Sequence, residues 1–291
     1  MAEKCMEHFK CLGEPERQIA TELCEQAGVT VESVYCQGEA MAALARTIRS
    51  LEGDAICKLP FASIAEAEQL GAKWQLGQYI QQPVPGELPY KKLEDVEIKP
   101  FSFDWGIMQE VLKGIITLKS QGETVSFNLE GPFTLLGMLV PSQEIYRGMR
   151  RQPALLRQLC GKLIDNIATE AARLAMAGVD MLSYADPMVT CRLVSPAVYT
   201  SLCGEITRVA LRAIATAAPG VTIHVCSATS AVFQQAGFCH CQAHKVPEKM
   251  CYGAALCFAH QQLGAQIVGH GCIQHSCWPL AKPVVYELEL C

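Results

Sequence analysis

The sequence predicts an α/β protein built on a largely parallel sheet, and three observations lead to this fold class. Short apolar segments alternate with helical segments through most of the chain. These apolar segments are hydrophobic enough to be buried on both faces, as the strands of parallel sheets are. The polar residues that interrupt the pattern stand at the ends of the apolar segments, where such folds carry their chemistry.

Six segments combine an apolar run with turn residues at their ends, which is typical of buried strands. The first, GDAICKLPF, begins at a glycine and reaches a proline near its end. The sixth is expected to be the last strand of the chain. The predicted strands are residues 53–61, 124–131, 179–187, 221–227, 238–244 and 265–272.

The segments between these strands have the spacing and end residues of helices. Residues 37–52 place Met41, Leu44 and Ile48 on one face of an amphipathic helix. Ser195 and Pro196 suit the N-cap and the first position of a later helix. The predicted helices are residues 37–52, 63–72, 105–122, 153–178, 195–220, 229–237 and 246–264.

The chain shows no internal repeat and no domain linker. Residues 80–104 contain four prolines and little periodicity, so they predict a long surface excursion. We expect an N-terminal helical segment at residues 1–36 and a single barrel-like domain at residues 37–291.

Composition excludes several classes of protein. The 24 Lys and Arg residues against 29 Asp and Glu residues leave a net charge of −5, which disfavours a nucleic-acid-binding surface. Half of the residues are hydrophobic, which disfavours disorder. We find no apolar run of about 18 residues and no secretory signal, so we expect a cytoplasmic protein without a membrane span.

The 16 cysteines are expected to be reduced thiols, because disulfides are rare in proteins without an export signal. Many lie inside apolar segments, where cysteine acts as a small hydrophobic residue. So many oxidisable thiols favour an anaerobic or strongly reducing cell.

One pair of polar residues predicts a metal site. His224 and Cys226 are two residues apart on a predicted strand, so both side chains face the same side. Imidazole nitrogen and thiolate sulfur are donors that zinc accepts. Cys272 ends the sixth strand behind two glycines and is expected to approach the same centre. The alternative is that the pair arises by chance, since the chain has many cysteines.

Further polar residues stand at predicted strand ends. Asp186 and Glu130 are candidate catalytic carboxylates at the mouth of the sheet, and Tyr184 is a candidate cavity residue. The alternative for each carboxylate is a structural role in capping or ordering a loop. His240 and His244 are candidates for a fourth metal ligand. His270 and His275 flank Cys272, and His270 should point away from it if the strand is regular.

These motifs together resemble the uroporphyrinogen-decarboxylase-like superfamily, and within it the methylcobalamin:coenzyme M methyltransferase branch. The resemblance covers roughly residues 38–280. It is carried by DAICKLPFASIAEAEQLGAKWQLG, NLEGPFTLLGMLV, GVDMLSYADP, IHVCSATS and QIVGHGCI.

The resemblance implies a TIM-type (β/α) barrel that binds zinc through a His-x-Cys pair and a later Cys, here His224, Cys226 and Cys272. It implies a methylcorrinoid as methyl donor, delivered by a corrinoid carrier protein, and a small-molecule thiol as acceptor. Zinc would lower the pKa of a bound thiol, and the thiolate would attack the methyl group.

The sequence departs from the family pattern in two ways. Only six strands are evident where eight are expected, so the barrel is expected to be incomplete or irregular. Its exposed edges would need cover from loops or from a second copy in a homodimer. The arginine-rich N-terminal segment of uroporphyrinogen decarboxylase is absent, which disfavours decarboxylation of a porphyrinogen.

Three functions therefore compete. The first is the zinc-dependent methyltransferase of anaerobic one-carbon metabolism. The second is a metal-free enzyme on the same barrel that acts on a tetrapyrrole or a small acid. The third is a non-catalytic corrinoid-binding or assembly partner, which the missing strands favour.

Overall fold

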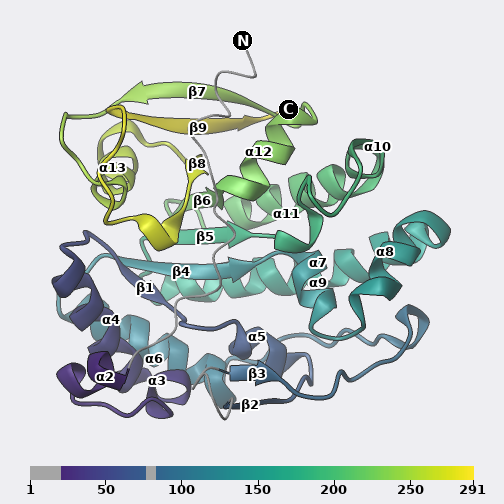
Figure 1. Ribbon diagram of the computed structural model, residues 1–291, viewed down its shortest axis with the longest axis horizontal. Coiled ribbons are helices and arrows are strands. Elements are labelled where there is room, and N and C mark those ends of the chain that lie inside the picture. The colour runs from purple at the N-terminus through teal and green to yellow at the C-terminus, as the bar shows by residue number, and fades with distance from the viewer. Residues whose placement is uncertain (1–20, 77–82) are drawn as a thin grey trace.

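Seven strands form one sheet in the order β1-β4-β5-β6-β8-β9-β7 within the part of the chain that the structure describes (Figure 1). The structure is a computed structural model that describes residues 21–76 and 83–291. A separate pair, β2 and β3, is antiparallel. The strands are β1 (Cys57–Leu59), β2 (Trp74–Leu76), β3 (Pro83–Pro85), β4 (Val125–Glu130), β5 (Met181–Ala185), β6 (Thr222–Cys226), β7 (Cys239–Lys245), β8 (Ile267–Gly271) and β9 (Val284–Leu290).

Helices connect the strands and cover the sheet. The α-helices are α2 (Thr21–Ala27), α3 (Ser33–Cys36), α4 (Gly38–Glu52), α5 (Ile64–Gln69), α6 (Gly106–Ser120), α7 (Pro132–Gly137), α8 (Ser142–Arg151), α9 (Pro153–Met176), α10 (Pro196–Val198), α11 (Gly204–Ala217), α12 (Ser227–Gln235) and α13 (Tyr252–Phe258). Shorter 3₁₀ turns are η1 (Leu93–Asp95), η2 (Pro187–Val189) and η5 (Ile273–His275), and π-helical turns are η3 (Tyr199–Cys203) and η4 (Ala259–Leu263).

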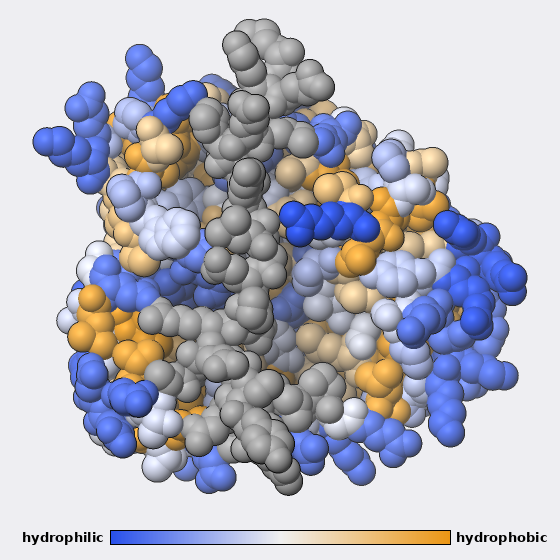
Figure 2. All heavy atoms as spheres, in the orientation of Figure 1, coloured by the Kyte–Doolittle hydropathy of each residue, from blue (hydrophilic) through white to orange (hydrophobic). Residues whose placement is uncertain are grey.

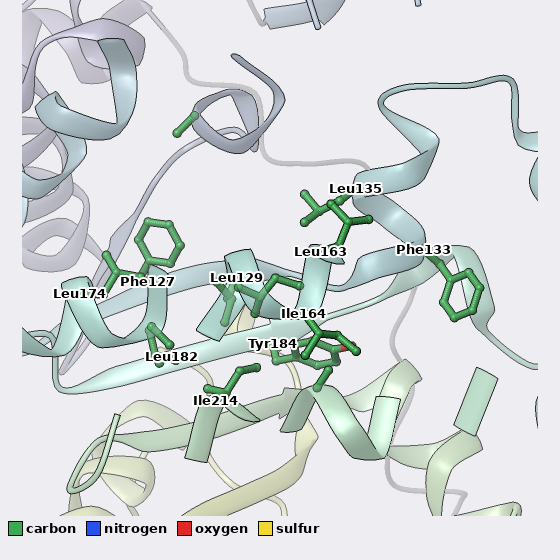
Figure 3. Close-up of a cluster of buried hydrophobic side chains, with 14 of the residues drawn as sticks. Phe127, Leu129, Phe133, Leu135, Leu163, Ile164, Leu174, Leu182, Tyr184 and Ile214 are labelled. Carbon is green, nitrogen blue, oxygen red and sulfur yellow. The ribbon is translucent and has the colours of Figure 1, made fainter. Parts of the chain in front are cut away.

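The main hydrophobic core lies between the sheet and the helices on one of its faces. Figure 3 shows Leu163 and Ile164 of α9 and Ile214 of α11 packed near side chains of β4 and β5. Phe127 and Leu182 from those strands are fully buried. Each such side chain contributes roughly 1.5–3 kcal/mol by leaving water. The helices α2 and α3 add Cys24, Val34 and Tyr35 to the same cluster, so residues 21–36 pack with the rest of the chain.

A second apolar cluster lies on the opposite face of the sheet, beneath α13. Met181 of β5 and Val268 of β8 meet Tyr252, Ala255 and Leu256 of this helix. The helix therefore fills part of the space that the interior of a closed barrel would occupy.

The predicted α/β class with an incomplete barrel is confirmed. β1, β4, β5, β6 and β8 run parallel to one another, so the carboxyl ends of these five strands lie on one side (Figure 1). Within the described residues the sheet does not close, since β1 and β7 are its edges. All six predicted strands form.

Three details differ from the prediction. The sixth predicted strand is not the last, because β9 follows it and runs antiparallel to β8. β7 pairs antiparallel with β9, so the predicted strand 238–244 is not part of the parallel set. The helix predicted for residues 246–264 begins only at Tyr252, since Lys249 has a φ of +64°, which a right-handed helix does not allow. The excursion predicted at residues 80–104 contains β3 and η1, and its first residues, 80–82, lie outside the described part.

A search of the described residues found no helix long and apolar enough to cross a membrane.

A close approach of α4 to α6 gives the first testable prediction. A Cβ at Gly38 would lie 2.3 Å from the backbone oxygen of Glu110, so Gly38→Ala forces the two helices apart. We expect a loss of about 1–3 kcal/mol in the free energy of unfolding, measured by urea denaturation. Gly161→Ala in α9 is the control. It meets no atom within 4 Å and should stabilise by up to about 1 kcal/mol. Equal effects of both variants would contradict the packing argument.

Candidate functional site

A cavity of about 270 Å³ opens at the carboxyl ends of the parallel strands. Ser183 and Ala185 of β5 both face it, because side chains two residues apart on a strand point to the same face. Residues of α4 and of η5 complete its wall. The polar side chains that line it are Arg49, Lys58, Ser63, Asn128, Glu130, Ser183, Cys226, Thr229, Cys272 and Gln274.

His224 lies directly behind this cavity and is fully buried. Its Nδ1 is 2.9 Å from Ser183 Oγ on β5, and its Nε2 is 3.2 Å from the carbonyl oxygen of Gly271 on β8. The Tyr252 ring packs edge-on against the imidazole at a centroid distance of 5.8 Å. The predicted His224 is thus held in place by groups on three other elements.

The environment of His224 keeps its imidazole neutral. Burial lowers its pKa to about 4, although the hydrogen bond with Gly271 opposes this shift. In the neutral ring one nitrogen donates and the other accepts. Donation from Nε2 to the Gly271 carbonyl leaves Nδ1 to accept from the Ser183 hydroxyl. A hydroxyl also accepts, so the same Ser183 can stabilise the tautomer in which Nε2 carries a lone pair for a metal ion.

Cys226 and Cys272 both line the cavity, and they come from adjacent strands. Cys226 is paired in register with Gly271, the residue before Cys272. A bulge makes this possible, because His270 is an extra residue on β8 with a φ of +66°. Bulges beside functional sites redirect side chains in this way. The glycines around His270 were the only signal of it in the sequence.

The three predicted ligands fit a metal ion in donor type and neighbourhood. They offer one imidazole nitrogen and two sulfurs, the donor set of several zinc sites. Among the described residues, however, their ligand atoms do not form a group that lies within 4.8 Å of one another. Both ring nitrogens of His224 also have hydrogen-bond partners, so metal binding would require one of them to give up its partner.

A different group does meet that distance within the described residues: Glu52, Asp54 and Cys277. Lys58 Nζ already lies 2.9 Å from Asp54 Oδ2 and 3.9 Å from Glu52 Oε2. The ammonium group supplies the positive charge there, so a metal ion would have to compete with it.

Asp186 follows β5 and is fully buried, and its side chain lies against the N-terminus of α7. Its carboxylate accepts hydrogen bonds from the backbone N–H groups of Phe133 and Thr134, at 3.2 and 2.9 Å, and from Thr134 Oγ1 at 2.7 Å. Burial raises the pKa of Asp186 to about 7, although these hydrogen bonds oppose the shift. The residues around it, Ala185 and Pro187, line the cavity, whereas Asp186 does not.

Replacement of Asp186 tests this structural position. Asp186→Ala leaves the N–H groups of Phe133 and Thr134 buried without their acceptor, and we expect a loss of about 3 kcal/mol in unfolding free energy. Asp186→Asn keeps one acceptor oxygen and should lose less. Urea denaturation of both variants measures the difference. If Asp186→Ala is as stable as the wild type, the carboxylate does not hold α7.

Glu130 lies where two cavities meet. It lines the first cavity and a second one of about 370 Å³, which α5, α7 and β2 also border. Ser63 Oγ donates to Glu130 Oε1 at 2.5 Å. Of the predicted catalytic carboxylates, Glu130 is the one that faces the cavities.

Tyr184 lies away from the cavity. Its ring is fully buried beside Ile164 and Ile214 on the helix-covered face of the sheet (Figure 3). The neighbouring Ser183 faces the cavity instead. The expectation that Tyr184 lines the cavity is therefore corrected: the alternation along β5 sends Ser183 there.

The candidate fourth ligands lie elsewhere too. His240 and His244 are on β7, which β9 separates from β8. His244 Nε2 is 2.8 Å from Glu287 Oε2, and His275 stacks on Trp278. His270 points away from the cavity toward α12 and β7, as its hydrogen bonds to Ser230 and Cys241 show.

Sequence reasoning missed Ser183 and Tyr252, which hold His224 in place. Ser183 had a weak signal, since it is a polar residue within an apolar strand. Tyr252 had none, because its contact with His224 depends on how α13 folds over the sheet.

The family model described as Uroporphyrinogen decarboxylase (URO-D) matches residues 11–270. The methylcobamide:CoM methyltransferase MtaA of Methanosarcina barkeri is 25% identical over 239 residues, which are 79% of this chain and 68% of that protein. The methylcobamide:CoM methyltransferase MtbA of Methanosarcina mazei is 26% identical over 216 residues, 72% of this chain and 62% of that protein. A solved methyltransferase from Methanosarcina mazei has a similar fold, with a TM-score of 0.63 at 22% identity, over 76% of this chain and 68% of that one.

Proposed function

Because the chain belongs to the uroporphyrinogen decarboxylase (URO-D) family, we propose that it is a zinc-dependent methyltransferase that moves a methyl group from a methylcorrinoid to a thiol. Its similarity to methylcobamide:CoM methyltransferases supports the donor and the class of acceptor. The observation that carries the proposal is the position of Cys226 and Cys272 on the wall of one cavity, with His224 directly behind it.

His224, Cys226 and Cys272 would hold the zinc ion. When bound, zinc acts as a Lewis acid that favours the deprotonated form of an acceptor thiol. Three protein ligands leave one position for that thiol, as catalytic zinc sites require. Ser183 fixes the His224 ring, so the nitrogen that would bind the metal keeps its direction.

The two cavities provide room for the acceptor thiol. Ala62, Ser63, Glu130 and Pro187 belong to both of them, so the cavities are contiguous. A small thiol fits the first cavity beside the cysteines. Glu130 Oε1, held by Ser63, faces such an acceptor and is placed to exchange a proton with it. The carrier protein would present its corrinoid at the carboxyl ends of the strands, where the cavities open.

The test is a methyl-transfer assay with methylcobalamin as a surrogate donor. Zinc-loaded protein should methylate at least one thiol from a panel of small thiols, with loss of the methylcobalt absorbance. His224→Ala should lower the rate more than Asp186→Ala, because it removes a ligand, whereas Asp186 holds α7. Absence of methylation with every thiol, in protein that carries zinc, would overturn the proposal.

One observation favours the second candidate, a non-catalytic corrinoid-binding partner. The ligand atoms are apart and the sheet is open among the described residues. A corrinoid protein that binds tightly, without methyl transfer to any thiol, would support this reading. A metal-free enzyme is distinguished by full activity of Cys226→Ser.

A further inference from the structure

A second group of thiols lies outside the cavity, where β7, β8 and α12 meet. Cys241 Sγ on β7 is 3.0 Å from His270 Nε2, which comes from β8 across the intervening β9. Cys239 is two residues earlier on the same strand, so both thiols face the same side. None of the three residues lines either cavity.

Ser230 on α12 determines which nitrogen of His270 faces the thiol. Ser230 Oγ accepts from the backbone N–H of His270 at 3.0 Å and donates to the Ser227 carbonyl at 3.3 Å. Its remaining capacity is as an acceptor, so the contact of 3.4 Å with His270 Nδ1 is a bond from Nδ1–H. The lone pair of the neutral ring is then on Nε2 and points at Cys241 Sγ.

This arrangement has the parts of an activated nucleophile: a thiol, a base within hydrogen-bond distance and a third group that orients the base. His270 is held firmly, since it is 3% exposed and packs edge-on against Tyr286. A hydrogen bond from the Cys239 thiol, together with the contact with His270, lowers the pKa of Cys241, while burial opposes the shift.

Small reagents can reach the site. β7 is an edge strand in the described sheet, and Cys241 on it is only half-buried. Cys239 is only 3% exposed, so a reagent meets Cys241 first.

We propose that Cys241 is a nucleophilic thiol that forms a mixed disulfide with a low-molecular-weight disulfide, RSSR. The Cys241 proton leaves along the hydrogen bond to His270, and Sγ attacks one sulfur of RSSR. The S–S bond of the reagent breaks as the new one forms, and the departing RS⁻ takes up the proton as RSH. Cys241 is oxidised and the reagent is reduced, so electrons and atoms balance.

The mixed disulfide should persist. Residues two apart on a strand have Cα atoms about 6.6 Å apart, at the upper end of the range for a disulfide. The antiparallel ladder with β9 holds β7 extended from Cys239 to Lys245. Cys239 therefore cannot readily displace the RS group by closing a bond to Cys241.

The experiment treats the full-length protein with a limiting amount of bis(2-hydroxyethyl) disulfide at neutral pH and locates the adduct by peptide mass spectrometry. We expect Cys241 to carry it at least about tenfold faster than Cys191, an exposed cysteine that serves as a control in the same molecule. Equal rates at Cys241 and Cys191, or a Cys239–Cys241 disulfide as the main product, would overturn the proposal.

A variant separates activation by His270 from simple accessibility. His270→Gln removes the base, so it should slow the reaction of Cys241 about tenfold. A purely structural role predicts the opposite, because loosening of the site would expose Cys241 and speed its reaction. The outcome does not depend on methyl transfer, so it stands apart from the proposed function.

Discussion

Replacement of Cys226 or Cys272 by serine is expected to abolish zinc binding. Wild-type protein purified anaerobically should hold about one zinc ion per chain. Each variant should hold less than about a tenth of that amount. A serine hydroxyl is a poor ligand because it stays protonated at neutral pH, whereas a thiol loses its proton to the metal. Methyl transfer should fall with the metal content. Elemental analysis and the methylcobalamin assay measure both quantities.

Two control variants test whether the loss of zinc is specific to the proposed ligands. Cys191→Ser, at an exposed position, should keep the wild-type zinc content. Ser183→Ala keeps all three ligands and removes the hydrogen bond to His224 Nδ1, so we expect a loss of affinity of about 10–100-fold. Wild-type protein without zinc after growth in zinc-replete medium would show that the ligand assignment is wrong.

The parallel part of the fold could be predicted because its strands are buried on both faces. β4, β5 and β6 are rich in apolar residues, and each is followed by a clear turn or N-cap signal. β9 was missed although VVYELEL alternates as a strand does. Its place in the sheet, between β8 and β7, depends on pairing with distant segments, which the alternation does not contain.

The candidate site could be predicted only in part. The period of two in a strand predicted that His224 and Cys226 face the same side of the sheet. In the structure Cys226 lines the cavity and His224 lies directly behind it. The same rule gave Tyr184 the wrong side, because the strand was counted through Asp186 and β5 ends at Ala185. Contacts that join distant segments, such as Ser183 with His224 or Asp186 with α7, depend on strand order, which local patterns do not contain.

The expectation that His270 points away from Cys272 is confirmed, but a regular strand is not the reason. Residues 270 and 272 would share a face of a regular strand. They are separated because the bulge at His270 changes the register between β6 and β8. One inserted residue therefore produces both outcomes: Cys272 reaches the cavity, and His270 reaches Cys241 on the other side.

Glu170→Gln is expected to stabilise the protein at neutral pH. Glu170 on α9 is fully buried, and neither carboxyl oxygen has a hydrogen-bond partner among the described residues. Burial, and then the nearby Glu66 and Glu130, raise its pKa well above the usual value.

The sign follows from the two pKa values of Glu170. Below its unfolded-state pKa both states hold the proton, and the contribution to stability is fully present. As the pH rises toward the folded-state pKa, only the unfolded state loses the proton, so stability falls. Each pH unit in this window is worth about 1.4 kcal/mol. Above the unfolded-state pKa, from about pH 5 upward, the wild type should therefore lose unfolding free energy with rising pH, whereas Glu170→Gln should not. Urea denaturation across this range measures the difference.

Asp165→Asn, an exposed substitution on the same helix, should follow the wild-type curve. Parallel curves for Glu170→Gln and the wild type would mean that Glu170 is ionised in the folded protein, and that its charge has a partner there.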